Sequence, residues 1–127
     1  MSARWVEWSF SQKVQNPTPI EPIDKQARSL MILEVAILDV IPGRESEFQL
    51  SFAEAEKIIS SMNGYANHQL KRCVEKPSRY ILMVDWERLE DHTEGFRNSP
   101  QYQEWKALLH HYYQPFPEVE HYLDIAK

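Results

Sequence analysis

The segment from Tyr80 to Glu87 constrains the fold of this chain more than any other stretch. It reads Tyr-Ile-Leu-Met-Val-Asp-Trp-Glu, and β-branched, aromatic and large apolar residues of this kind favour a mostly buried strand. Trp86 ends the apolar run, and His92 follows on what should be the first turns of a helix. An indole at the end of a strand and an imidazole on the next helix can face each other across a pocket. We therefore expect the functional site at this junction.

The apolar patterns in the rest of the chain predict three more strands and two longer helices. Apolar residues recur every three or four positions over 44–62, which predicts an amphipathic helix, and Gly64 follows where a left-handed conformation is tolerated. Ser99-Pro100 predicts the N-cap and first turn of the last helix. In chain order we predict a strand at 30–41, a helix at 44–62, strands at 65–74 and 79–87, a short helix at 89–98, a helix after Ser99 and a strand at 119–125.

The order β-α-β-β-α-β is that of the ferredoxin-like α+β fold, in which both helices lie on one face of an antiparallel sheet. The predicted strands are strongly apolar, so a bare second face is unfavourable. We therefore expect a homodimer in which a second copy covers that face and the two sheets close into a barrel.

Residues 1–29 differ from the predicted domain at 30–127. Trp5, Trp8 and Phe10 are apolar anchors in a polar context, and three prolines then predict a linker. One interpretation, which we favour, is a loosely attached arm. The other is an arm that docks its tryptophans on the domain or on a second subunit.

Charge and cysteine content restrict the partners and the compartment. The net charge of −5 argues against a nucleic-acid partner, because no basic stripe is present to neutralise phosphates. No apolar run approaches the roughly 18 residues of a membrane span. Cys73 is the single cysteine, so an intrachain disulfide is excluded and a reducing cytoplasm is expected.

Several short motifs along the domain match one known family. They are Ile41-Pro42-Gly43-Arg44, Glu47-Phe48, Trp86-Glu87, His92, Phe96-Arg97-Asn98-Ser99, Tyr102, Trp105, Pro117 and Val119-Glu120-His121-Tyr122. Together they resemble the antibiotic biosynthesis monooxygenase family of dimeric α+β barrels, over about residues 30 to 126.

The resemblance implies a pocket in each subunit, between the sheet and the helices. In monooxygenases of this family a quinol or other phenolic aromatic compound is deprotonated and reacts with O₂ without metal or flavin, so no cofactor is expected. The protein would supply a dry apolar pocket, hydrogen-bond donors for the anion and a base. The alternative is a non-catalytic dimer that binds a small hydrophobic metabolite in the same pocket.

Two subgroups of the family are disfavoured by departures from their patterns. Haem degraders pair a first-strand asparagine with a histidine ten positions after the tryptophan, but this chain has Phe96 there and no asparagine in its first strand. Members acting on aromatic polyketides carry an asparagine four residues before the tryptophan, where this chain has Leu82.

The candidate catalytic residues are Trp86, His92 and His68. Trp86 matches the family's strand-end tryptophan and serves as pocket wall, core residue or both. His92 either donates to a substrate oxygen or is a solvated residue of the first helical turn. His68 shares a strand face with Leu70 and is either the base or a histidine satisfied by a backbone carbonyl.

The residues expected to bind substrate are Trp86, Tyr80, Phe96, Glu34 and His121. Tyr80 shares the predicted apolar face of Trp86, which would form the pocket wall. His121 belongs to the motif that carries the resemblance, and its alternative role is at the dimer interface.

Glu34 interrupts an otherwise apolar strand. A buried carboxylate there would have a raised pKa and would suit a general base. The alternative, which we favour from the sequence, is an ion-pair partner for Arg72 or Arg79 at the subunit interface.

Overall fold

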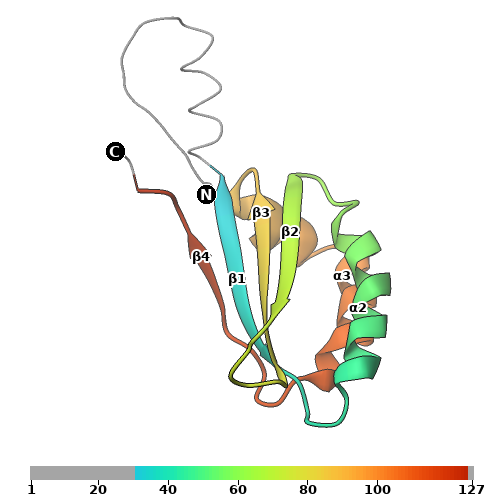
Figure 1. Cartoon of the computed structure of the whole chain (residues 1–127). Coiled ribbons are helices and arrows are strands. Elements are labelled where there is room, and N and C mark those ends of the chain that lie inside the picture. Colours follow the sequence, from blue (N-terminus) through green and yellow to red (C-terminus); the bar gives the residue numbers. More distant parts are fainter. Residues whose placement is uncertain (1–30, 126–127) are drawn as a thin grey trace, which may run out of the picture.

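The sheet places β1 (Ile32–Asp39) and β3 (Arg79–Trp86) at its centre. In the computed structural model, which describes residues 31–125, the strand order is β2-β3-β1-β4 and every neighbouring pair is antiparallel. The edge strands are β2 (Tyr65–Arg72) and β4 (Val119–Tyr122). This is the predicted ferredoxin-like α+β fold (Figure 1).

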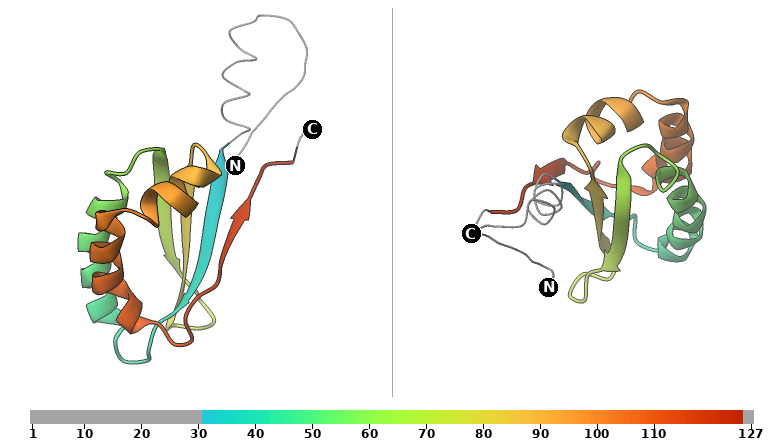
Figure 2. Two further views of the ribbon diagram at one scale, coloured as in Figure 1. Left: turned by 180° about the vertical axis from the view of Figure 1, so that it is seen from behind. Right: turned by 90° about the horizontal axis from the view of Figure 1, so that it is seen from above.

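The helices gather on one face of the sheet, as both views in Figure 2 show. The longer two are α2 (Glu45–Ile59) and α3 (Pro100–Leu109). Between β3 and α3 lies a π-helix, η1 (Asp91–Phe96), and a 3-10 turn, η2 (His110–Tyr112), follows α3. No helix within residues 31–125 has the length and apolar character needed to cross a membrane.

Alternation along the central strands fixes which side chains face the helices. On β3 the buried residues are Tyr80, Leu82, Val84 and Trp86, which confirms the predicted apolar face. The register then pairs each of them with β1, so that the buried positions of β1 point the same way. Glu34 is one of these positions, and its carboxyl group therefore enters the core side of the sheet.

Local signals in the sequence set the element ends. Ser99 is the N-cap of α3, and its hydroxyl accepts a hydrogen bond from the Tyr102 amide at 3.1 Å. Gly64 has the predicted left-handed conformation, with φ of 82°. The predicted short helix at 89–98 exists, but as a π-helix of six residues. The predicted arm at 1–29 lies outside the described residues.

Candidate functional site

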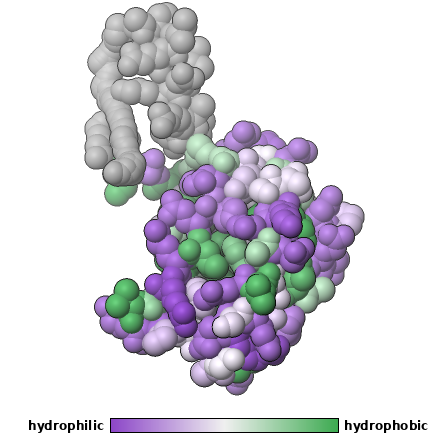
Figure 3. Space-filling model, turned by 45° about the vertical axis from the view of Figure 1, so that its right-hand side comes forward, coloured by the Kyte–Doolittle hydropathy of each residue, from purple (hydrophilic) through white to green (hydrophobic). Residues whose placement is uncertain are grey.

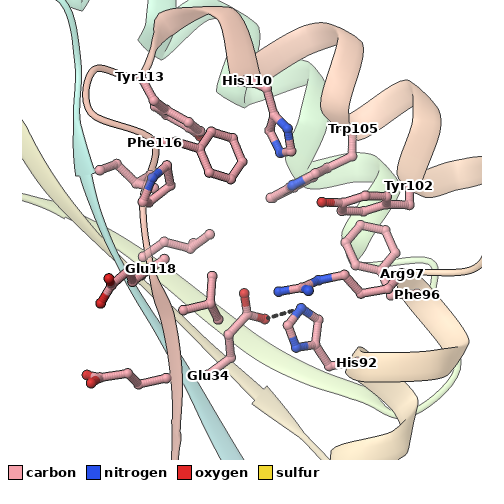
Figure 4. Close-up of a pocket in the computed structure, with 16 residues that line it drawn as sticks. Glu34, His92, Phe96, Arg97, Tyr102, Trp105, His110, Tyr113, Phe116 and Glu118 are labelled. Carbon is pink, nitrogen blue, oxygen red and sulfur yellow. Dashed lines mark ion pairs between the residues drawn. The ribbon is translucent and has the colours of Figure 1, made fainter.

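A cavity of about 480 Å³ lies between α3 and the β1–β4 half of the sheet. Its floor is formed by β1 and β3, and its polar edge carries His92, Arg97, His110, Glu118 and Glu120. Aromatic rings form most of the remaining wall (Figure 4); they belong to Phe96, Tyr102, Trp105, Tyr113 and Phe116.

Glu34 is the carboxyl group at the base of this cavity. It is 6% exposed, and the indole Nε1–H of Trp86 donates a hydrogen bond to its Oε1 at 2.9 Å. Burial raises the pKa of Glu34 from 4.5 to about 7, against the opposing effects of the Trp86 hydrogen bond and the positive charge of Arg97. The carboxyl group therefore titrates near neutral pH.

His92 lies beside Glu34 with both ring nitrogens engaged. Its Nε2 is 3.5 Å from Glu34 Oε1, and its Nδ1 is 2.8 Å from Nε2 of His121. The ring is 2% exposed and stacks on Trp86, with centroids 5.5 Å apart and planes 22° apart. Burial, together with the charge of Arg97, lowers the pKa of His92 to about 3. Its contact with Glu34 therefore involves a neutral imidazole at neutral pH.

The π-helix turns His92 inward and is held by a close contact with Gly64. A carboxylate oxygen of Asp91, the first residue of η1, accepts a hydrogen bond from the amide of Arg88 at 3.1 Å. A Cβ atom on Gly64 would lie 2.0 Å from that oxygen, so only glycine fits here, and its φ of 82° also favours glycine. π-turns are rare and are enriched at functional sites. The Asn63-Gly64 turn thus positions the helix that carries His92.

Arg97 is a functional candidate that the sequence analysis left without a role. It extends its guanidinium group toward Glu34 and His92 (Figure 4). Among residues 31–125 no ion pair involves Arg97. Its position directly after Phe96, within the motif that resembles the family, was the available signal.

The structure brings most of the predicted site residues together. Glu34, His92 and Phe96 line the cavity. Trp86 is fully buried behind them and reaches the site through its hydrogen bond to Glu34. His121 is the cross-strand neighbour of Glu34 and contacts His92.

The favoured interpretation of Glu34 as an arginine partner is wrong. Arg79 pairs instead with Asp39 through two hydrogen bonds of 2.8 and 3.1 Å. The Nε–H of Arg72 donates to the backbone oxygen of Pro77. Glu34 faces the helices, because it shares its side of β1 with the buried Ala36 and Leu38.

His68 and Tyr80 lie away from the cavity. His68 sits on edge strand β2, with Nε2 2.9 Å from Glu56 Oε1 and Nδ1 2.6 Å from the Tyr65 hydroxyl. Tyr80 is 2% exposed at the far end of β3, where Gln49 Nε2 donates to its hydroxyl at 2.6 Å. The prediction that His68 faces the pocket is therefore corrected: its strand face was right, but α2 lies over that part of the sheet.

The surface on the helix side of the molecule is mainly hydrophilic. Figure 3, which brings the helix side forward, shows apolar side chains gathered near the middle of that face and surrounded by hydrophilic ones. Within the described residues no group of three or more His, Cys, Asp or Glu side chains is arranged to hold a metal ion.

Comparison with known proteins agrees with this fold. The family model described as antibiotic biosynthesis monooxygenase matches residues 31–108. The chain is similar to the uncharacterized protein YczJ of Bacillus subtilis (strain 168), with 55% identity over 95 residues, which is 75% of this chain and 100% of YczJ.

Solved structures show the same arrangement. A Bordetella bronchiseptica protein with the same family description superposes with a TM-score of 0.72 and 37% identity, covering 75% of this chain and 97% of that one. SnoaB, a cofactor-independent oxygenase from Streptomyces nogalater, has a TM-score of 0.59 at 20% identity (N63A mutant), covering 77% of this chain and 94% of SnoaB. The second match shows a shared fold alone. From the match over residues 31–108, this chain belongs to the antibiotic biosynthesis monooxygenase family.

Proposed function

We propose that this protein is a cofactor-independent monooxygenase that oxidises a quinol or similar phenolic compound with O₂. The observation that carries the proposal is the placement of Glu34: a buried carboxyl group, with a pKa of about 7, at the base of an aromatic-lined cavity. Membership of the family supports it, as does the fold shared with SnoaB, whose name describes a cofactor-independent oxygenase.

Glu34 is suited to act as the base that removes a phenolic proton. A general base works best when its pKa is close to the operating pH, and burial tunes Glu34 to that range. Oε1 accepts from Trp86, whereas no side chain of the described residues donates to Oε2. The second oxygen of Glu34 is thus available to a substrate hydroxyl in the cavity that Glu34 lines.

Arg97 supplies the charge that the resulting anion requires. Its guanidinium group points to the same part of the cavity as the Glu34 carboxyl group (Figure 4). A cation beside a partly water-excluded pocket stabilises a phenolate more strongly than it would in water. The substrate anion then reacts with O₂, and the base and the cation act on the same oxygen atom of the substrate.

The cavity walls fit an aromatic substrate of modest size. A volume of about 480 Å³ lies within the range of ligand pockets, about 300–1,000 Å³. Phe96 and Tyr102 meet edge to face at 5.3 Å, and Phe96 and Trp105 do so at 5.6 Å. Such rings offer offset and edge-on contacts to a planar ligand.

The homodimer is part of the same proposal. The sheet face away from the helices carries Leu33, Val35, Ile81 and Met83 in partly buried positions, and Ile37 is 39% exposed there. A second copy would cover this face. Sedimentation at micromolar concentration tests it, and a monomer would contradict the dimer without affecting the assignment of the cavity.

Oxygen uptake with a panel of quinols and naphthols in metal-free buffer tests the activity. We expect uptake by the wild type, and a fall of about 10²–10⁴-fold in kcat/KM for Glu34→Gln. Glu54→Gln is the matched control, because Glu54 is an exposed residue of α2. His68→Ala separates the two candidate bases: this geometry predicts that it retains activity, and a loss equal to that of Glu34→Gln would return the role of base to His68.

A second measurement decides between catalysis and binding. If no compound supports uptake while naphthols bind with equal affinity across about pH 5 to 9, the protein is a small-molecule binder and the monooxygenase proposal is overturned. The proposed base is supported if the naphthol affinity of the wild type changes near pH 7 and that of Glu34→Gln does not.

A further inference from the structure

Three titratable side chains form a continuous line from the cavity to the edge of the sheet. Glu34 lines the cavity, His92 is buried beside it, and His121 lies on the edge strand β4. We propose that His92 and His121 form a proton relay that carries the proton taken up by Glu34 from the cavity to the β4 edge of the sheet. The inference rests on the proposed role of Glu34 as the base and extends it by a path of proton release.

The geometry of the three groups is that of a relay. His92 uses its two ring nitrogens on opposite sides, with Nε2 3.5 Å from Glu34 Oε1 and Nδ1 2.8 Å from His121 Nε2. A substrate would leave its proton on Glu34 Oε2, and half a turn of the carboxyl group about its terminal torsion, which has a broad energy minimum, would bring this O–H to His92 Nε2. Stacking on Trp86 and contact with Phe96, at centroid distances of 5.5 and 6.4 Å, hold the ring in this orientation.

The proton count balances without charging His92. In the loaded state Glu34 is a neutral acid whose O–H donates to Nε2 of His92, while His92 Nδ1–H donates to Nε2 of His121. The Glu34 proton moves to His92 Nε2 as the Nδ1 proton of His92 moves to His121 Nε2. The Nδ1 proton of His121 passes to water. Glu34 becomes a carboxylate, both histidines exchange tautomers, and one proton leaves the protein.

The charges around the line favour transfer through neutral rings. Arg97, at the start of the segment between η1 and α3, lowers the pKa of both His92 and His121, although burial is the larger cause for each. His110, at the end of α3, also faces the cavity and has a pKa lowered to about 4. Glu118 and Glu120 also line the cavity, from the segment that leads into and forms β4.

A relay would give the buried base Glu34 a way to release its proton. Glu34 is 6% exposed, and an aromatic substrate in the cavity would separate it further from solvent. The base must nevertheless lose its proton before each new turnover. His121 is only partly buried, and no described residue forms a hydrogen bond with its Nδ1. The path through the two rings therefore ends at a partly exposed residue that does not line the cavity.

The first test reads the tautomers directly and needs no substrate. Nitrogen chemical shifts of isotope-labelled histidines, followed from about pH 5 to 9, report which ring nitrogen carries the proton. We expect neutral His92 to change from the Nδ1–H to the Nε2–H tautomer as Glu34 ionises. His121→Phe keeps a ring in place but removes the acceptor, and in this variant the change should be lost. A single tautomer at every pH in wild type would overturn the relay, whether or not the protein consumes O₂.

The second test uses turnover with the best quinol of the panel. In His121→Phe we expect kcat to fall while KM changes little. The fall should be smaller than the loss of about 10²–10⁴-fold expected when the base itself is removed. Added imidazole should restore part of the loss, because it supplies the missing acceptor. His111→Gln is the control, since His111 is exposed on η2 and its ring is tilted against that of its neighbour Tyr112. An unchanged kcat and solvent isotope effect in His121→Phe would contradict the relay.

Discussion

The two helices cover the same face of the sheet in different ways. Beneath α2 the polar groups are paired: Gln49 donates to the Tyr80 hydroxyl at 2.6 Å, and the hydroxyls of Ser51 and Tyr112 are 3.0 Å apart. Phe48 fills the space between them, with its ring 4.9 Å from that of Tyr80. This half is closely packed, and these polar groups are hydrogen-bonded to each other.

Beneath α3 the packing opens into a cavity and the polar groups remain titratable. Glu34 and His92 are as buried as the core of the other half, yet burial moves the pKa of each far from its ordinary value. A buried polar group without a full set of partners costs stability. The two halves thus differ in their polar groups: those named under α2 are hydrogen-bonded to each other, whereas under α3 two buried groups have strongly shifted pKa values.

The strongest test of that division compares two phenylalanines. Phe48 is fully buried under α2, whereas Phe116 lines the cavity and is 62% exposed. Phe48→Ala should lower the free energy of unfolding by about 3–5 kcal/mol, because it leaves a void in packed surroundings. Phe116→Ala should change it by no more than about 0.5 kcal/mol. Urea unfolding measures both, and equal losses would contradict the division.

The pH dependence of stability isolates the contribution of Glu34. Its folded pKa is raised from 4.5 to about 7, so its contribution to stability is full below about pH 4.5 and is lost as the pH rises through 7. Relative to Glu34→Gln, the wild type should therefore lose about 3 kcal/mol across this range.

The contribution of His92 to stability changes with pH in the opposite direction and must be removed from the comparison. Its folded pKa is lowered from 6.5 to about 3, so its contribution is present above 6.5 and is lost as the pH falls. Wild type and Glu34→Gln both carry His92, and comparing them at each pH removes most of this effect. Denaturant unfolding at a series of pH values is the measurement, and a constant difference between the two proteins would contradict the burial of a titrating Glu34.

The difference between the two halves also explains what the sequence predicts and what it leaves open. Alternation along β3 identifies its buried face, and Ser99-Pro100 marks the start of α3, because these signals are local. His68 has the predicted strand face but lies under α2, because alternation determines the face of a strand and not the helix above it.

Glu34 and the π-helix show a second limit. β1 is apolar on both faces, so its pattern does not reveal which face meets the helices, and the orientation of Glu34 depends on register with β3. The π-helix differs from an α-helix by the span of its hydrogen bonds, which apolar spacing over six residues does not record. Arg97 directly follows η1, so the direction of its side chain depends on this π-helix and could not be predicted from the sequence pattern.

Enlarging one alanine in each half gives a test of intermediate size. Ala55 is fully buried on α2, whereas Ala36 lies on β1 and lines the cavity. Ala55→Leu should cost about 1–3 kcal/mol through overpacking. Ala36→Leu should cost less, because its side chain enters the cavity, and it should weaken naphthol binding. A larger stability loss from Ala36→Leu than from Ala55→Leu would show that the cavity half is packed as tightly as the other.

The smallest effect comes from removing one hydroxyl in each half. Tyr80→Phe deletes the partner of Gln49 and should cost about 1 kcal/mol, the net value of a typical hydrogen bond. Tyr113 lines the cavity, and no described residue forms a hydrogen bond with its hydroxyl, whose pKa burial raises. Tyr113→Phe should therefore leave the unfolding free energy unchanged or increase it slightly. Thermal unfolding of the two variants side by side measures the difference. An equal loss in both would mean that the Tyr113 hydroxyl is hydrogen-bonded as fully as that of Tyr80. Polar groups without hydrogen-bond partners would then not distinguish the cavity half.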